Sequence, residues 1–152
     1  MSFEGDVSLV GHSMGGLVAR RVAEFGIPGI RIRRMVMIGT PLLGNQIAQY
    51  FSRLPLQSFP YGKLWPALSP ESCRANSKAI DGVEMGMVAG SVPGGRWLCG
   101  EETDGIVTVP ATMGSGLTDH ATVPASHASL LLSGKVAAMT AHFLAAGTFS
   151  GL

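Results

Sequence analysis

The 152-residue sequence has few charges, two cysteines and no long hydrophobic run. Charged residues make up 14% of the chain, against roughly 25% in an average soluble domain. With a formal net charge of +1, no field would concentrate nucleic acid, and we expect no such partner. No apolar stretch approaches the roughly 20 residues that cross a bilayer. Residues 1–6 carry two acids and no basic region, so we expect no signal peptide and, by default, a cytoplasmic location.

Cysteine and phosphate-loop chemistry is also scarce. Cys73 and Cys99 lie 26 residues apart, which allows one bridge but gives neither residue the neighbours of a zinc site. There is no glycine-rich phosphate loop and no dinucleotide fingerprint. We therefore expect no metal and no cofactor.

The sequence is rich in glycine and proline, with 21 and 9 residues, placed between short apolar segments. Apolar runs predict strands at 7–10, 35–38, 83–89 and, more weakly, 121–124. Helical spacing predicts helices at 14–25, 43–54 and 135–145. This alternation indicates an α/β fold, a mainly parallel sheet of about four strands flanked by helices. We expect one minimal domain over 1–152, with a proline-punctuated, cap-like insertion at about 42–80.

The most informative segment is GHSMGG at 11–16, which follows the first strand and precedes the first helix. It matches G-x-S-x-G, a strained strand-to-helix turn that lifts a serine hydroxyl out of a sheet. Ser13 is the predicted nucleophile, and small residues at Gly11 and Gly15 are expected to avoid clashes in the turn. Because the helix N-terminus points free N–H groups at the site, the N–H of Met14 is placed to bind an oxyanion.

A serine hydroxyl needs a general base, and the chain has four histidines. His127 stands in a loop between the last strand and the last helix, from which it can reach the carboxyl end of the sheet, and it is the first choice. His120, at the start of a weak strand, stays as the reserve. His12 is expected to shape the turn and to contact substrate. His142, in the last helix, is interpreted as a packed or surface residue.

The base needs an acid that orients it. Asp104 follows the third strand and its long loop, so its carboxylate is expected at the carboxyl end of that strand, within reach of His127. Glu101 and Glu102 are interpreted as solvated loop residues and Asp119 as a turn cap. All three stay as alternatives.

Four segments, in this order, resemble the carboxyl-terminal half of an α/β-hydrolase of the bacterial lipase/esterase type. They are GHSMGG at 11–16, IGTP at 38–41 with Gly44 completing a GTPxxG pattern, DGIV at 104–107 and SH at 126–127. The resemblance covers the chain from Val7 to about Leu144. It implies a triad of Ser13, His127 and Asp104 that acts through an acyl-enzyme.

Members of that family usually carry four further strands before the nucleophile strand, with a His-Gly segment that donates a second oxyanion N–H. Here the nucleophile strand begins about seven residues from Met1, so the chain resembles strands five to eight of eight. The first strand would be a sheet edge with unpaired backbone groups. We expect another copy of the chain to cover this edge, and a second oxyanion donor to come from the 42–65 segment or from that partner.

Apolar residues between the second and third strands suggest an acyl-binding wall. Leu42, Leu43 and Phe51 are its candidates, although residues at helical spacing there also suit packing on the sheet. Short- to medium-chain carboxylic esters, lipid esters among them, are the expected substrates. Two alternatives stay open: a weak or inactive binding module without a complete oxyanion hole, and a thioesterase or acyltransferase with the same triad.

Five of the eleven basic residues fall within fifteen positions: Arg20, Arg21, Arg31, Arg33 and Arg34. We interpret this cluster as a solvated helix end and loop. The alternative is transient contact with anionic lipid head groups.

Overall fold

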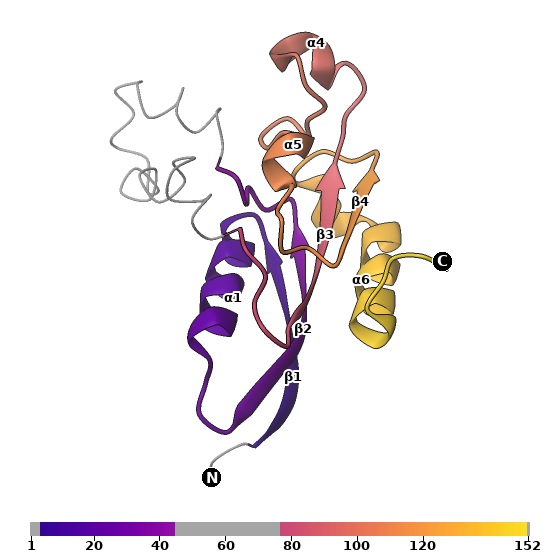
Figure 1. Cartoon of the computed structure of the whole chain (residues 1–152). Coiled ribbons are helices and arrows are strands. Elements are labelled where there is room, and N and C mark those ends of the chain that lie inside the picture. The colour runs from indigo at the N-terminus through magenta and orange to yellow at the C-terminus, as the bar shows by residue number, and fades with distance from the viewer. Residues whose placement is uncertain (1–3, 45–76, 152) are drawn as a thin grey trace, which may run out of the picture.

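The computed structural model describes residues 4–44 and 77–151. Four strands in these ranges form one sheet in chain order, and each neighbouring pair is parallel (Figure 1). They are β1 (Gly5–His12), β2 (Ile30–Ile38), β3 (Glu84–Gly90) and β4 (Asp119–Val123). The predicted α/β class and the four-stranded parallel sheet are therefore confirmed.

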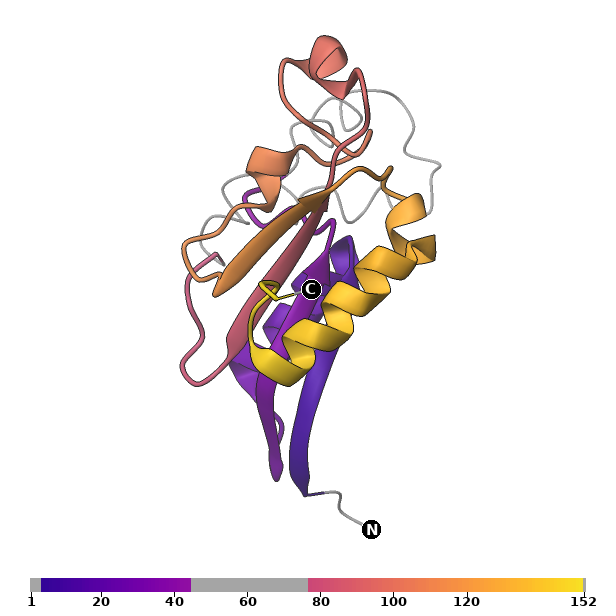
Figure 2. The ribbon, with the colours of Figure 1, turned by 90° about the vertical axis from the view of Figure 1, so that its right-hand side faces the viewer.

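Helices cover both faces of the sheet. Helix α1 (Met14–Phe25) lies on one face and α6 (Gly134–Ala146) on the other (Figures 1 and 2). Successive β2 residues alternate between the two layers: Met35 and Met37 belong to the core on the α1 side, and Val36 and Ile38 to the core on the α6 side. A strand buried on both faces explains why this stretch reads as an unbroken apolar run.

Two glycines let the layers approach closely. A Cβ built on Gly86 of β3 would lie 2.9 Å from the rings of Phe143 and Phe149, which pack on each other with ring centroids 4.9 Å apart. Helix α6 ends at Gly147, whose φ of 81° suits the left-handed turn that leads into Phe149. The predicted helix at 135–145 and its glycine stop are confirmed.

Helix α1 has the predicted bounds. Its buried residues are Gly16, Arg20 and Ala23, and Leu17 and Val22 pack against the same core, whereas Val18 and Phe25 are 61% and 80% exposed. The burial of Gly16 follows from its close approach to the sheet, described below.

Three short helical segments were not predicted: α4 (Gly95–Cys99) within the long loop after β3, α5 (Val109–Thr112), and the 3-10 turn η2 (Ser129–Leu132). Segments of four or five residues are too short to show a period in sequence. The predicted helix at 43–54, most of the 42–80 insertion, Phe51 and Cys73 lie outside the described residues.

The interpretation of the arginine cluster as a helix end and loop is wrong. Arg31, Arg33 and Arg34 lie on β2, because that strand begins at Ile30. Arg34 donates to the carboxylate of Glu84 and to the carbonyls of Leu144 and Ala145, so it joins the sheet to the end of α6.

Arg20 is also not solvated. It is 3% exposed and donates to the carbonyl of Lys78 at 2.8 Å. Burial lowers its pKa, and the nearby Glu24 carboxylate opposes that shift. Arg20 thus ties α1 to the chain that enters β3.

Candidate active site

The turn after β1 has the backbone of a nucleophile elbow. Ser13, between β1 and α1, has a φ of 54° and is the one non-glycine residue with positive φ in the described chain. Such a conformation is costly for a residue with a side chain and persists where neighbours fix it. Here the N–H of Ser13 donates to the carbonyl of Ile38 at 2.8 Å, and its carbonyl accepts from Gly16 N–H at 3.1 Å.

A threonine just beyond the next strand also holds the elbow. The Thr40 hydroxyl, fully buried, donates to the Ser13 carbonyl at 2.9 Å. It occupies the space that a side chain at Gly16 would need, since a Cβ there would lie 2.0 Å from Thr40 Oγ1. A Cβ at Gly11 would likewise lie 2.5 Å from the Gly15 carbonyl oxygen. The close approaches are therefore at Gly11 and Gly16; a Cβ on Gly15 would meet nothing within 4 Å, so the expectation of a clash at that glycine is wrong.

His127 and Asp104 form a buried pair. His127 Nδ1 lies 2.6 Å from Asp104 Oδ2, and the residues are 8% and 2% exposed. The backbone N–H of His127 also donates to the Asp104 carbonyl at 2.9 Å. Because a carboxylate only accepts, Nδ1 carries the proton and Nε2 of the neutral ring keeps its lone pair. This is the tautomer that a general base requires.

Backbone N–H groups of its own turn hold the Asp104 carboxylate in place, independently of His127. Asp104 Oδ1 accepts from the N–H groups of Ile106 and Val107 at 2.9 and 2.7 Å. Gly105, between Asp104 and Ile106, has a φ of 97°, which a residue without Cβ adopts at no steric cost. The DGIV segment is therefore a tight turn that leaves Oδ2 for His127.

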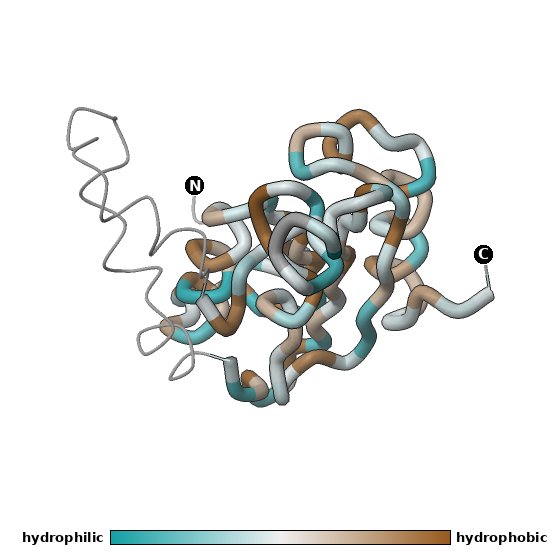
Figure 3. The backbone as a smooth tube through the Cα atoms, turned by 90° about the horizontal axis from the view of Figure 1, so that it is seen from above, coloured by the Kyte–Doolittle hydropathy of each residue, from teal (hydrophilic) through white to brown (hydrophobic). Residues whose placement is uncertain are grey.

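The elbow and the pair lie at the same end of the sheet. Ser13, Asp104 and His127 follow β1, β3 and β4, and the strand arrows of Figure 1 point toward this end of the molecule, which Figure 3 views from above. His12, the residue before Ser13, contacts the base directly: its Nε2 is 3.0 Å from the His127 carbonyl oxygen, and the two rings are 4.6 Å apart. No pattern in the sequence signals this contact, because it joins residues 115 positions apart.

Gly39 lies beside the contact between His127 and Asp104. It follows β2 with a φ of 57°, and its N–H donates to the Val88 carbonyl at 2.8 Å. A Cβ here would lie 3.2 Å from His127 Nδ1 and 3.3 Å from Asp104 Oδ2. The glycine of the GTP segment thus leaves the space in which the imidazole and the carboxylate meet.

The other histidines lie elsewhere. His120, on β4, has its Nε2 2.9 Å from Thr112 Oγ1; since that hydroxyl donates to the Val109 carbonyl, it accepts from His120. Burial lowers the pKa of His120, against the pull of Asp119. His142 is half-buried on α6, with its Nε2 3.0 Å from the Ser150 carbonyl oxygen. Neither His120 nor His142 bonds to a carboxylate at the carboxyl end of the sheet.

The alternative acids also have other positions. Asp119 accepts from Thr148 Oγ1 and from the N–H groups of Phe149 and His120, so it fixes the C-terminal segment rather than a base. Glu102 is exposed and Glu101 half-buried. The structure thus places Asp104, and none of these three carboxylates, beside His127.

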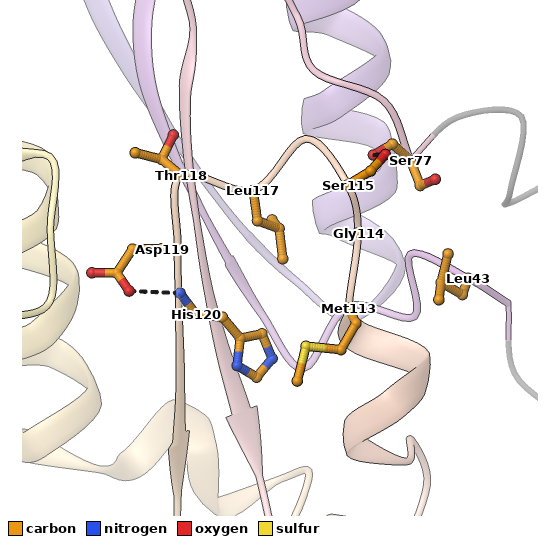
Figure 4. A pocket seen from close by; sticks show the side chains of 9 residues that line it. All are labelled: Leu43, Ser77, Met113, Gly114, Ser115, Leu117, Thr118, Asp119 and His120. Atoms are coloured by element: carbon orange, nitrogen blue, oxygen red, sulfur yellow. Dashed lines mark hydrogen bonds between the residues drawn. The ribbon is translucent and has the colours of Figure 1, made fainter.

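The remaining predicted residues divide between core and surface. Met14 begins α1, where its N–H has no acceptor within the helix. Leu42 is 2% exposed and packs in the α1-side core, so it belongs to that core and not to an open wall. Leu43 is half-buried and lines a separate hollow of about 620 Å³ with Met113, Leu117 and His120 (Figure 4).

Within the two described ranges, no group of three or more His, Cys, Asp or Glu side chains is placed to hold a metal ion. In the same ranges, no helix is both long and apolar enough to cross a membrane.

Comparison with solved structures identifies the architecture. The chain superposes on the mature form of Bacillus licheniformis lipase BlEst2 with a TM-score of 0.62 and 18% identity, over 94% of this chain and 66% of that one. For the propeptide form the TM-score is 0.66 and the identity 19%, over 91% of this chain and 35% of that one. The chain thus shares its α/β fold with part of this lipase.

The chain spans just under two thirds of the mature lipase, 66% of its length. At this identity the likeness concerns the fold. No family model matches the sequence, and no curated protein matches it.

Proposed function

We propose that the chain is a serine carboxylic-ester hydrolase that acts on short- to medium-chain acyl esters. The observation that carries this proposal is the buried His127–Asp104 pair, which lies against the histidine that precedes Ser13 in a strained elbow. A lipase fold with these three residue types at the carboxyl ends of its strands supports the same conclusion.

In this mechanism the Ser13 hydroxyl attacks the ester carbonyl while His127 Nε2 takes its proton. The new imidazolium is stabilised by Asp104, which holds Nδ1–H at 2.6 Å. The tetrahedral intermediate collapses as Nε2–H gives its proton to the leaving alkoxide, which departs as the alcohol. Water, activated by the same nitrogen, then attacks the acyl-Ser13 ester, releases the acid and restores the hydroxyl.

The oxyanion of each tetrahedral intermediate is assigned to the N–H of Met14, at the positive end of α1. This is one donor; a second is expected from the 42–65 segment, most of which lies outside the described residues, or from a partner, and the described residues assign none. Because removing one donor from an oxyanion hole costs on the order of 10²–10³ in kcat, the proposal predicts slow turnover of activated esters.

The test uses p-nitrophenyl acetate, butyrate, octanoate and palmitate with the wild type, Ser13→Ala and Asp104→Asn. We expect turnover that vanishes in Ser13→Ala and falls by about 10³–10⁴ in Asp104→Asn, since an amide at residue 104 favours the wrong imidazole tautomer. The acyl length with the highest kcat/KM gives the size of the acyl pocket. His120→Gln is the matched control and should keep wild-type activity, because His120 is bonded to Thr112.

A fluorophosphonate probe provides a second readout that needs no ester substrate. It should label the wild type at Ser13 and leave Ser13→Ala unlabelled, because only an activated serine attacks it quickly. Equal background hydrolysis by wild type and Ser13→Ala, together with no labelling, would show that the triad residues are idle and that the chain is a binding module.

A further inference from the structure

We propose that His12 is a positioning residue, which holds the main chain of His127 against the nucleophile elbow. The inference rests on the proposed function, in which His127 is the base. It concerns the second position of GHSMGG, where the sequence predicted a contact with substrate.

The contact fixes the protonation of His12. The distance from His12 Nε2 to the His127 carbonyl oxygen is 3.0 Å, and since a carbonyl only accepts, Nε2 carries the hydrogen. Burial lowers the pKa of His12; the hydrogen bond to His127 opposes this, while the charges of His127 and Asp104 act in opposite directions. Near pH 7 His12 is therefore a neutral donor.

The contact also spans the sheet. His12 ends β1 and His127 follows β4, and these strands stand at opposite edges. Three strand spacings of about 4.8 Å separate such edges by roughly 14 Å. The two rings are nonetheless 4.6 Å apart, so the loop that carries His127 folds back across the carboxyl ends of the strands and is fastened there by His12.

Three hydrogen bonds then hold His127 from two sides. Nδ1 and the backbone N–H both engage Asp104, and the backbone carbonyl engages His12. The first two set the tautomer and the orientation relative to the acid. The third sets the position of the ring relative to the elbow, and thus the distance from Nε2 to the serine hydroxyl. Without it Asp104 alone holds the loop that carries His127, so the loop opens more readily and the ring loses its fixed distance from the nucleophile.

Two variants separate the donor from the ring. His12→Phe keeps a ring of similar shape and removes the donor, and His12→Gln keeps an N–H donor and removes the ring. We expect His12→Phe to lower kcat by about tenfold with KM unchanged, the effect of one lost hydrogen bond. His12→Gln should retain most of kcat. A rise in KM with kcat unchanged would assign His12 to substrate binding, and equal losses in both variants would assign its role to ring packing; either result overturns the proposal.

Nitrogen-15 NMR of the histidines tests the same contact without turnover. His12 should show the Nε2–H tautomer, and the low-field proton on His127 Nδ1 should exchange faster in His12→Phe than in His12→Gln or the wild type. An Nδ1–H tautomer at His12, or an unchanged His127 proton in His12→Phe, overturns the proposal. Absence of Ser13-dependent turnover with these NMR results intact would instead overturn the hydrolase.

Discussion

The contact between Gly16 and Thr40 can be tested by a double-mutant cycle. In Gly16→Ala the new Cβ would lie 2.0 Å from Thr40 Oγ1 and 2.9 Å from Thr40 Cγ2, where an ordinary contact is about 3.5–4.0 Å. Thr40 is fully buried, so it cannot swing into solvent. Either α1 or the threonine must move, and the bond from Thr40 to the Ser13 carbonyl is lost in the process.

The expected free energies follow from these contacts. Overpacking costs about 1–3 kcal/mol and the lost hydrogen bond about 1 kcal/mol, while alanine gains about 1 kcal/mol over glycine inside a helix. Gly16→Ala should thus lower the free energy of unfolding by about 2 kcal/mol. Thr40→Ala loses the same bond and a buried methyl group, again about 2 kcal/mol. In the double variant the hydrogen bond is lost once, the helix gain of about 1 kcal/mol remains, and the methyl group introduced at residue 16 fills the space vacated at residue 40. We therefore expect a loss of about 0–1 kcal/mol rather than the additive loss of about 4 kcal/mol.

Urea unfolding of the four proteins, followed by circular dichroism, measures the coupling. Gly15→Ala is the matched control, because its Cβ would meet nothing within 4 Å and the change should be neutral or stabilising. Additive losses in the double variant, or a loss below about 0.5 kcal/mol in Gly16→Ala, would refute the reasoning, since such values are ordinary for uncoupled surface changes.

Two further predictions concern the ends of the described chain. The N–H of Phe149, with the Thr148 hydroxyl and the His120 N–H, lowers the pKa of Asp119 below its usual 3.8. Because the pKa of Asp119 is lower in the folded than in the unfolded protein, its carboxylate stabilises the fold above the unfolded-state pKa. This stabilisation is lost as the pH falls through the folded-state pKa. The Tm difference between wild type and Asp119→Asn should therefore be largest near neutral pH and close as acid is added, and a difference constant with pH would contradict this. At the other end, β1 has one neighbour among the described strands, and we propose that a second copy covers its free edge; light scattering should show a dimer, and a monomer with freely exchanging β1 amides would contradict it.

The sequence predicted the positions of the strands well, and predicted poorly the features that depend on packing between elements, such as the length of β2 and the burial of Gly16. Four apolar runs predicted all four described strands. The second half of β2 and most of β3 are buried on both faces, which favours unbroken apolar residues, whereas β1 and β4 are only partly buried. The length of β2 was missed, since its first half alternates exposed arginines with inward residues such as Ile32. The burial of Gly16 in α1 could not be predicted, because the close contact with Thr40 depends on packing and a small residue carries no hydrophobic signal.

The candidate site divides in the same way. The order of GHSMGG, DGIV and SH along the chain predicted which residues follow which strands, and the structure brings Asp104 and His127 to 2.6 Å. The sequence could not predict the contacts made by Thr40 and His12, because both residues bond to residues far away in the chain. One signal was present: a polar residue directly after a buried strand, as in Ile38-Gly39-Thr40, is costly unless its hydroxyl finds a buried acceptor. Here that acceptor is the Ser13 carbonyl.

The contacts around Ser13, Asp104 and His127 show which strands of the four-stranded sheet hold the proposed catalytic residues. The bonds that hold Ser13 come from Ile38 and Thr40, at the end of β2 and just beyond it, and the acid and base follow β3 and β4. Apart from His12 on β1 and Gly16 on α1, the described groups that hold the three proposed catalytic residues therefore lie on the β2 side of β1, away from its free edge. A second oxyanion donor stays an expectation, from the 42–65 segment or from a partner chain. If that donor is absent, the reaction type is preserved and the rate suffers, so the chain should show low kcat that is still wholly dependent on Ser13.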